Sequence, residues 1–255
     1  MAEAATKQRV QPQPRRIAYS SSHEAELHDY AQPDIDEDDA FWEMFLAARE
    51  YTMTAKDAMF ALYQAVGYVV RARLEGDFVE AGVWRGGSAL LAALAFRKLG
   101  DRRRLHLFDT FTGMTAPTDV DTDIMGDAAS DLMDRFAEAD GSWCYASEED
   151  VRSTFSRHGI SGDDLNIVKG DVLNTLPLNV PDRIAILRLD TDWYESTRLE
   201  LELLYPRLVR GGVLMIDDYG YWQGSRKATD EFFAALERPP LLNRVNDQVR
   251  LAIKV

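Results

Sequence analysis

The 255-residue chain has a single cysteine, Cys144, and only four histidines. One cysteine cannot form an intramolecular disulfide, and it cannot build a thiolate cage around a metal ion. No apolar run approaches the roughly 18 residues of a membrane span, and the N-terminus has no hydrophobic signal-peptide core. These absences predict a soluble, cytoplasmic protein.

Basic residues are also few, with 29 Lys and Arg against 43 Asp and Glu, which gives a formal net charge of −14. A surface this acidic repels the phosphate backbone of nucleic acids and anionic lipid headgroups. We therefore expect no nucleic-acid partner and no membrane partner. The hydrophobic content of 46% is enough for one large domain with a small extension.

Apolar periodicity is absent from the start of the chain and becomes regular further on. Residues 1–35 are predicted to be a flexible N-terminal arm. Residues 36–76 have helical spacing and predict an N-terminal helical extension, closed by Gly76 as a C-terminal cap. Residues 77–255 are predicted to be the main domain, with a lid insertion at about 112–147.

Short apolar strands alternate with helices from residue 77 onward, and this alternation predicts an α/β fold. We expect a mostly parallel, seven-stranded, Rossmann-like sheet with helices on both faces and a C-terminal antiparallel hairpin around Asn246 and Asp247. Ligands of such sheets bind beyond the carboxyl ends of the strands. Five predicted strands place an acid near that end, and these acids are expected to surround one crevice: Glu80, Asp109, Asp171, Asp190 and Asp217.

A glycine-rich turn follows the first predicted strand in VEAGVWRGGSALL. Gly82, Gly86 and Gly87 allow a tight turn and the close approach of a ligand to the N-terminus of the next helix. The turn lacks the G-x-G-x-x-G pattern of dinucleotide sites, and Glu80 would repel a pyrophosphate but could hold an ammonium group through water. S-adenosylmethionine therefore fits better than NAD. A structural turn without a ligand is the alternative.

Two further acids fit the adenosine half of such a cofactor. Asp109, at the end of the second strand, can accept hydrogen bonds from both ribose hydroxyls. Asp171, at the end of the third strand, can accept from the adenine amino group. Helix N-capping is the alternative for Asp171.

Two acidic pairs follow the fourth and fifth predicted strands. Neighbouring strands lie about 4.8 Å apart, so Asp190 and Asp217 can share one cation and Asp218 can add a third oxygen. Carboxylate oxygens without histidine or cysteine nearby favour Mg²⁺ or Ca²⁺ over zinc. A nearby carboxylate could then remove a proton from a hydroxyl held by the cation. Helix capping and solvated loops are the alternative for these acids.

Several motifs in this order resemble the TylF/MycF family of macrocin-type O-methyltransferases: EYTMT, GDFVEAGVWRGGSA, LFDTFTGM, RLDTDWYEST and GGVLMIDDYGYWQGSRKA. The resemblance covers about residues 50–255. It implies a class I methyltransferase fold, S-adenosyl-L-methionine and Mg²⁺ as cofactors, and methylation of a sugar hydroxyl on a glycoside or free sugar. It also implies a homodimer or larger homo-oligomer.

The resemblance implies a role for individual residues as well. The metal positions match Asp190, Asp217 and Asp218, and the catalytic base is an aspartate of the Asp-x-Asp pair, with Asp192 favoured and Asp190 as the alternative. Together with the glycine turn, it gives one set of expected cofactor contacts: Tyr51, Thr52, Met53, Glu80, Gly82, Val83, Trp84, Gly86, Gly87, Ser88, Asp109, Thr110, Phe111, Gly170, Asp171, Val172 and Asp190.

Aromatic residues near the insertion and the acids are candidate platforms for a sugar ring, with ordinary aromatic packing as the alternative. The expected substrate contacts are Trp143, Tyr145, Trp193, Tyr194 and Tyr219, and Tyr221 and Trp222 also flank the acids. Three rival functions stay open at this point. They are a nicotinamide-dependent reductase, a non-catalytic binder of S-adenosylmethionine, and a methyltransferase acting on a catechol-like diol.

Overall fold

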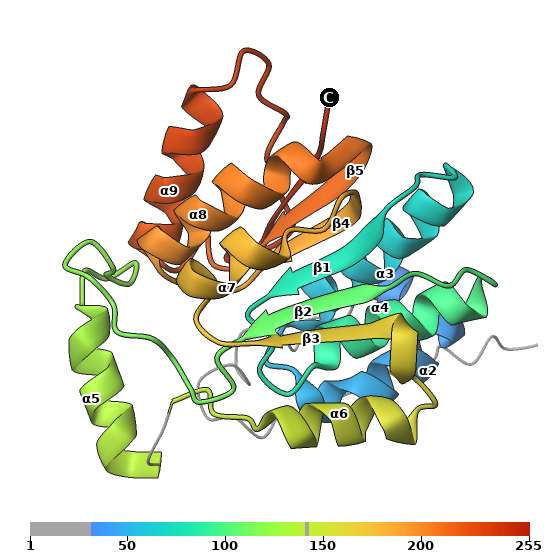
Figure 1. Ribbon diagram of the computed structural model, residues 1–255, viewed down its shortest axis with the longest axis horizontal. Coiled ribbons are helices and arrows are strands. Elements are labelled where there is room, and N and C mark those ends of the chain that lie inside the picture. Colours follow the sequence, from blue (N-terminus) through green and yellow to red (C-terminus); the bar gives the residue numbers. More distant parts are fainter. Residues whose placement is uncertain (1–31, 141–142) are drawn as a thin grey trace, which may run out of the picture.

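The computed structural model describes residues 32–140 and 143–255, with only the backbone described at 136–140. The predicted arm lies outside the described residues apart from 32–35, which begin the first helix. Within the described part, no helix is both long and apolar enough to traverse a bilayer. Figure 1 shows a twisted central sheet between helices, with one helix held away from it.

The central sheet has seven strands in the described residues, in the order β3-β2-β1-β4-β5-β7-β6. The strands are β1 Asp77–Ala81, β2 Leu105–Asp109, β3 Leu165–Lys169, β4 Ile184–Leu189, β5 Leu208–Ile216, β6 Asn243–Arg244 and β7 Arg250–Ile253. Strands β1 to β5 pair in parallel, and β7 runs antiparallel to β5 and β6. The predicted α/β fold and C-terminal hairpin are confirmed, and the strand order reverses between β1 and β4.

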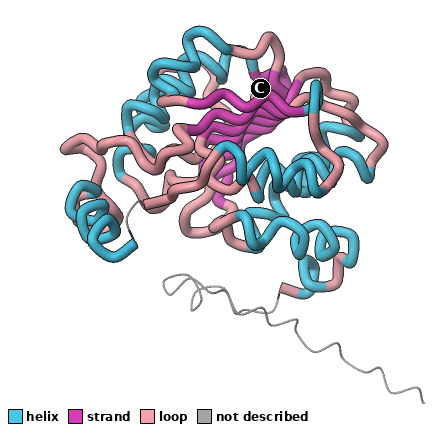
Figure 2. Tube along the Cα trace, turned by 60° about the horizontal axis from the view of Figure 1, so that its bottom comes forward, coloured by secondary structure: helices cyan, strands magenta, loops and turns pink. Residues whose placement is uncertain are grey.

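The sheet has a hydrophobic core on each face, because successive residues of a strand point to opposite faces. Phe78 of β1 packs in the core with the helices that precede β3, apart from the helix of the insertion. Val79 of the same strand packs in the other core, with the helices that follow β3. Figure 2 shows the strands enclosed between these helical layers. The helices are α1 Pro33–Asp36, α2 Asp39–Ala48, α3 Lys56–Arg71, α4 Gly87–Lys98, α5 Ala129–Asp140, α6 Glu148–Arg157, α7 Val172–Asn179, α8 Tyr194–Leu204 and α9 Gln223–Ala234.

The predicted helix cap at Gly76 is wrong. Helix α3 ends at Arg71, and Arg73 adopts the left-handed conformation with a φ of 54°. Gly76 instead lies just before β1 with a φ of 113°. A Cβ there would lie 2.8 Å from the backbone carbon of Ile184, so glycine lets the chain pass close to β4.

The predicted insertion contains a helix of its own. Helix α5 stands apart from the sheet at one edge of the molecule (Figure 1). A third, small cluster of apolar side chains joins this insertion to the main domain, with Ala129, Trp193 and Trp222 at its centre. The insertion therefore has packed contacts with the elements that carry the acidic pairs.

Candidate functional site

A cavity of about 420 Å³ opens beyond the carboxyl ends of β1, β2, β4 and β5. It joins the glycine turn to the acidic pairs, as the strand pattern predicts. Residues from the sequence-predicted cofactor set that line it are Tyr51, Thr52, Met53, Gly82, Val83, Trp84, Ser88, Asp109, Thr110, Asp171, Val172 and Asp190. Five others from that set are not among the lining residues: Glu80, Gly86, Gly87, Phe111 and Gly170.

The glycine turn is held by Asp109 at the end of β2. One carboxylate oxygen, Oδ2, accepts from the backbone N–H groups of Val83 at 2.7 Å and Trp84 at 2.9 Å. The other oxygen accepts from the N–H of Phe111 at 2.7 Å. Oδ1 also accepts from the Thr110 hydroxyl at 3.4 Å. Asp109 thus orders the turn and also lines the cavity.

Gly82 connects the turn to the acidic half of the site. Its φ is 81°, and a Cβ at this position would overlap the backbone oxygen of Asp190. The N–H of Asp190 donates to the carbonyl of Ala81 at 2.8 Å. Only glycine allows β1 to leave the sheet this close to the residue that follows β4.

The N-terminal extension closes the other side of the cavity at the start of α4. Ser88 lies within hydrogen-bonding distance of the Thr52 hydroxyl at 3.2 Å and the Thr54 hydroxyl at 3.3 Å. A Cβ on Gly87 would lie 2.6 Å from the backbone of Tyr51. The segment from Tyr51 to Thr54 is therefore packed directly on the N-terminus of α4, where its side chains reach the cavity.

Asp171 caps the N-terminus of α7, which was the alternative role considered for it, and it also lines the cavity. Its Oδ1 accepts from the N–H of Leu173 at 2.9 Å and caps α7. A capping carboxylate keeps a second oxygen available to a ligand. Both roles are compatible at this position.

Arg188 is the functional residue that sequence reasoning missed. It belongs to β4 and is 2% exposed, yet its guanidinium reaches three acids. It donates to Glu80 at 3.0 Å, to Asp190 at 2.5 Å and to Asp217 at 2.8 Å. A fourth hydrogen bond, at 2.8 Å, goes to the Thr54 hydroxyl. The signal in the sequence was a single charged residue within the apolar strand IAILRL.

The charges at the base of the cavity are strongly unbalanced. Glu80, Asp190 and Asp217 contact the guanidinium of Arg188, and Asp192 and Asp218 lie beside Asp190. Burial raises the pKa of Glu80 to about 8, although Arg188 opposes this shift. Burial likewise raises the pKa of Asp217 to about 7, again against Arg188. A second cation near these acids would favour their ionised forms.

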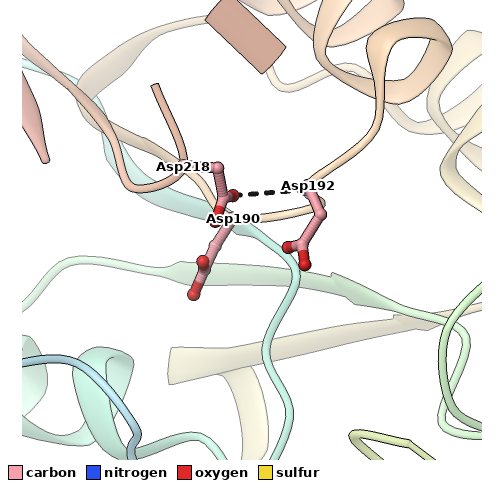
Figure 3. Close-up of side chains that lie close together, drawn as sticks. All are labelled: Asp190, Asp192 and Asp218. Carbon is pink, nitrogen blue, oxygen red and sulfur yellow. Dashed lines mark hydrogen bonds between the residues drawn. The ribbon is translucent and has the colours of Figure 1, made fainter. Parts of the chain in front are cut away.

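Three of the acids form a compact group of possible metal ligands. One carboxylate oxygen each from Asp190, Asp192 and Asp218 lies within 4.8 Å of the others, and Figure 3 shows these side chains together. The N–H of Asp192 donates to Asp218 Oδ2 at 3.2 Å, and Asp192 has a left-handed φ of 68°. Burial and the neighbouring acids raise the pKa of both Asp192 and Asp218 well above its ordinary value.

The geometry groups the acids differently from the sequence-predicted metal set. Asp190 and Asp218 lie together as expected, and Asp192 joins them. Asp217 lines the same cavity but uses Oδ1 to accept from Arg188. The donor set is all oxygen and unbalanced in charge, so it fits a hard divalent cation such as Mg²⁺.

The aromatic residues divide into those on the cavity wall and those away from it. Trp143, Tyr221 and Trp222 line the cavity, and buried Trp193 packs behind them with its ring centroid 4.9 Å from that of Trp222. Tyr145 is 54% exposed and lies outside the lining.

Tyr194 and Tyr219 also lie outside the lining. Their hydroxyls donate to α9, to Glu231 at 2.7 Å and to Asp230 at 2.8 Å. Of the sequence-predicted substrate contacts, the structure thus brings Trp143 to the cavity and Trp193 directly behind its wall.

Comparison with known proteins agrees with this geometry. Residues 2–248 match the model of the macrocin-O-methyltransferase (TylF) family. The chain is 38% identical over 170 residues to the 8-demethyl-8-(2,3-dimethoxy-alpha-L-rhamnosyl)-tetracenomycin-C 4'-O-methyltransferase of Streptomyces olivaceus, a match that covers 66% of this chain and 62% of that protein. The chain thus matches less than two thirds of that relative's length.

A second relative and a solved structure are also similar to this chain. The chain is 33% identical over 192 residues to demethyldecarbamoylnovobiocin O-methyltransferase of Streptomyces niveus, with 74% of this chain and 70% of that protein covered. The solved structure of the O-methyltransferase NovP superposes with a TM-score of 0.69 at 29% identity, over 80% of this chain and 82% of that one. Family model, relatives and fold confirm the resemblance, and the chain belongs to the TylF family of macrocin-type O-methyltransferases.

Proposed function

We propose that this protein transfers a methyl group from S-adenosylmethionine to a sugar hydroxyl of a glycoside, with the help of Mg²⁺. The single observation that carries the proposal is the placement of the glycine turn against the acidic group. Gly82 touches the backbone of Asp190, so the cofactor turn and the acids share one cavity. A methyl donor bound at the turn would therefore present its methyl group to an acceptor held at the acids.

The electrostatics of the cavity favour a cationic cofactor. In the described structure, three carboxylates contact the guanidinium of Arg188, and Asp192 and Asp218 lie beside one of them, Asp190, so the acidic groups here outnumber the one cation. A sulfonium and a divalent cation would both be attracted by this excess of negative charge, whereas the pyrophosphate of NAD would be repelled. This argument separates the proposal from the nicotinamide-dependent alternative.

Each acid has a proposed role. Asp190 and Asp218, with Asp192 or Asp217 as a further oxygen donor, would hold Mg²⁺, which when bound lowers the pKa of a hydroxyl and fixes its direction. Asp192 would accept the proton of the acceptor hydroxyl, since its carboxylate is in the acidic group and its backbone is fixed by Asp218. Asp190 is the alternative base. Arg188 would orient Asp190 and Asp217.

The acceptor side supports a sugar ring. Trp143 and Trp222 line the cavity beside the acids and offer flat apolar surfaces to the C–H face of a sugar. The name of the Streptomyces olivaceus relative specifies a rhamnosyl glycoside as its substrate. We propose the same class of acceptor for this chain, a deoxysugar or related sugar on a glycosylated small molecule.

The proposal is tested first by titration calorimetry with S-adenosylmethionine and with NADH, each with Mg²⁺ and with EDTA. Saturable binding of S-adenosylmethionine and none of NADH is expected. A panel of rhamnosyl and other deoxysugar glycosides, with catechol as the diol control, is then incubated with deuterated methyl donor and analysed by mass spectrometry. Methylation of a glycoside that EDTA abolishes and Mg²⁺ restores supports the proposal.

Other outcomes contradict particular parts of it. Methylation of catechol alone would replace the sugar acceptor by an aromatic diol. Binding of the cofactor with no transfer to any acceptor class would favour the non-catalytic binder. The homo-oligomer stays a prediction, and light scattering coupled to gel filtration measures it directly.

A further inference from the structure

The first half of the insertion is fastened to the turn that carries Asp192 by one buried carboxylate, Asp121. This side chain belongs to a residue that is 1% exposed. Its Oδ1 accepts from the backbone N–H of Tyr194 at 2.7 Å. Its Oδ2 accepts from the N–H of Thr118 at 2.7 Å and from the Thr118 hydroxyl at 2.8 Å. Both oxygens are therefore engaged, one within the insertion and one outside it.

The outside partner is the start of α8. Helix α8 begins at Tyr194, and among the described residues its own N-cap position, Trp193, supplies no side-chain cap. A carboxylate at a helix N-terminus satisfies a free N–H group and interacts favourably with the helix dipole. Here the cap comes from Asp121, far earlier in the chain. Asp121 therefore links a segment that is distant in sequence to the first residue of α8.

Tyr194, the capped residue, lies close in sequence to the acidic residues Asp190 and Asp192. Asp192 is two positions before Tyr194 and has a left-handed φ of 68°, a conformation that costs a non-glycine residue about 1 kcal/mol or more. Such a backbone persists only where its surroundings fix it on both sides. On one side the N–H of Asp192 donates to Asp218, and on the other Asp121 fixes the N–H of Tyr194.

Neighbouring contacts confine the carboxylate of Asp121 to this position. A Cβ on Gly224 of α9 would overlap Asp121 Oδ1 and would lie 2.9 Å from the N–H nitrogen of Tyr194. The N–H of Gln223 donates to the Thr122 carbonyl at 2.8 Å. The ring N–H of Trp193 donates to the Thr115 carbonyl at 3.0 Å. The insertion is thus joined to the starts of both α8 and α9.

We propose that Asp121 is a positioning residue for methyl transfer, which acts by holding the Asp190–Tyr194 turn in the geometry that the acceptor requires. The inference rests on the proposed function for its kinetic consequences. The insertion would then be part of the active-site scaffold as well as a cover. Variation in the insertion would alter turnover even where it touches neither cofactor nor acceptor.

The same loop offers a matched control in Asp123. This residue is also buried, at 6% exposed, and its Oδ1 accepts from the N–H groups of Met125 at 2.8 Å and Asp127 at 3.0 Å. Those partners belong to the insertion itself. Asp123→Ala therefore removes a buried loop carboxylate without removing a bond to α8, whereas Asp121→Ala removes both local and outside bonds.

The kinetic test compares Asp121→Ala, Asp121→Asn, Gly224→Ala and Asp123→Ala with the parent enzyme. Asp121→Ala is expected to lower kcat by about 10- to 100-fold, the range for a small misplacement of reacting groups, with an unchanged KM for S-adenosylmethionine. An asparagine oxygen can accept at Tyr194 or at Thr118 but not at both, so Asp121→Asn should restore part of kcat. Gly224→Ala pushes the carboxylate away and should resemble Asp121→Ala. Asp123→Ala should stay near the parent value.

A second measurement needs no acceptor. Hydrogen–deuterium exchange of the peptide that spans residues 190–198 should rise in Asp121→Ala and stay unchanged in Asp123→Ala. Equal exchange in the two variants, or equal loss of kcat in both, would overturn the proposal because it would show a general loosening of the insertion. If no acceptor is methylated by the parent enzyme, the proposed function fails while the exchange experiment still decides whether Asp121 holds the turn.

Discussion

Replacing Arg188 by methionine tests whether the buried guanidinium is what holds the acids of the site in place. The methionine keeps an apolar stem of similar length and removes the charge together with four hydrogen bonds, to Glu80, Asp190, Asp217 and Thr54. Loss of one partner of a buried ion pair costs about 3–5 kcal/mol because the remaining charge is uncompensated. We therefore expect a loss of that order in the free energy of unfolding near neutral pH.

The loss should depend on pH with a definite sign. The pKa of Glu80 is raised by burial to about 8, and that of Asp217 to about 7, both against the opposing effect of Arg188. A raised pKa means that the folded state binds more protons, so the stability associated with these groups is present at low pH and is lost as pH rises through the raised values. Without the guanidinium both values rise further. The destabilisation by Arg188→Met should therefore be largest above about pH 8 and should shrink towards about pH 5.

The assay is urea unfolding followed by circular dichroism, in EDTA, across that pH range. Arg188→Lys is the matched control, since it keeps the charge but cannot contact three acids with one planar fork. It should lose less stability than the methionine variant and show a weaker pH dependence. A loss below about 1 kcal/mol at neutral pH, the size of an exposed ion pair, or a loss that grows in acid, would refute this account of Arg188.

Three further predictions concern single residues. Asp192→Asn should lower kcat by about 10²- to 10⁴-fold, the contribution of a general base, with an unchanged Kd for S-adenosylmethionine in calorimetry. Gly82→Ala should abolish that binding, because its Cβ overlaps Asp190 and its φ of 81° is strained; circular dichroism checks that the variant folds. Glu200 lies buried in α8, where its Oε1 accepts from the Thr191 hydroxyl at 2.9 Å. Burial raises its pKa well above the ordinary value, so its stabilising effect is present in acid and is lost as pH rises. Glu200→Gln should therefore flatten the fall in unfolding free energy above about pH 4.5. A parallel pH dependence in both proteins would contradict the assignment to Glu200.

The fold was predictable because its signals are local and repeated. Each apolar strand is short, and an acid ends β2 or directly follows β4 and β5, which locates their carboxyl ends. Parallel pairing then brings those ends to one edge of the sheet. The antiparallel hairpin was equally visible, from the apolar residues on either side of Asn246 and Asp247.

The site was predictable only as far as backbone position determines it. Sequence spacing places Tyr194 and Tyr219 beside the acids, but their hydroxyls extend to α9 rather than into the cavity. Side-chain direction depends on the packing of α8 against α9, which no local pattern reports. Gly76 was misassigned for a related reason, since the close approach to β4 that requires glycine is a tertiary contact.

Arg188 is a cation among the acids that the acidic pattern alone did not indicate. Four carboxylates after two strands predict a cation among them, and the protein already supplies one from inside β4. A guanidinium that engages Asp190 and Asp217 makes a repulsive arrangement tolerable in the folded chain. Burial and the neighbouring acids raise the pKa of Asp192 and of Asp218, on the cavity side, so a bound cation would favour their ionised forms. The internal cation thus partly compensates Glu80, Asp190 and Asp217, and the proposed external cation would compensate the acids on the cavity side.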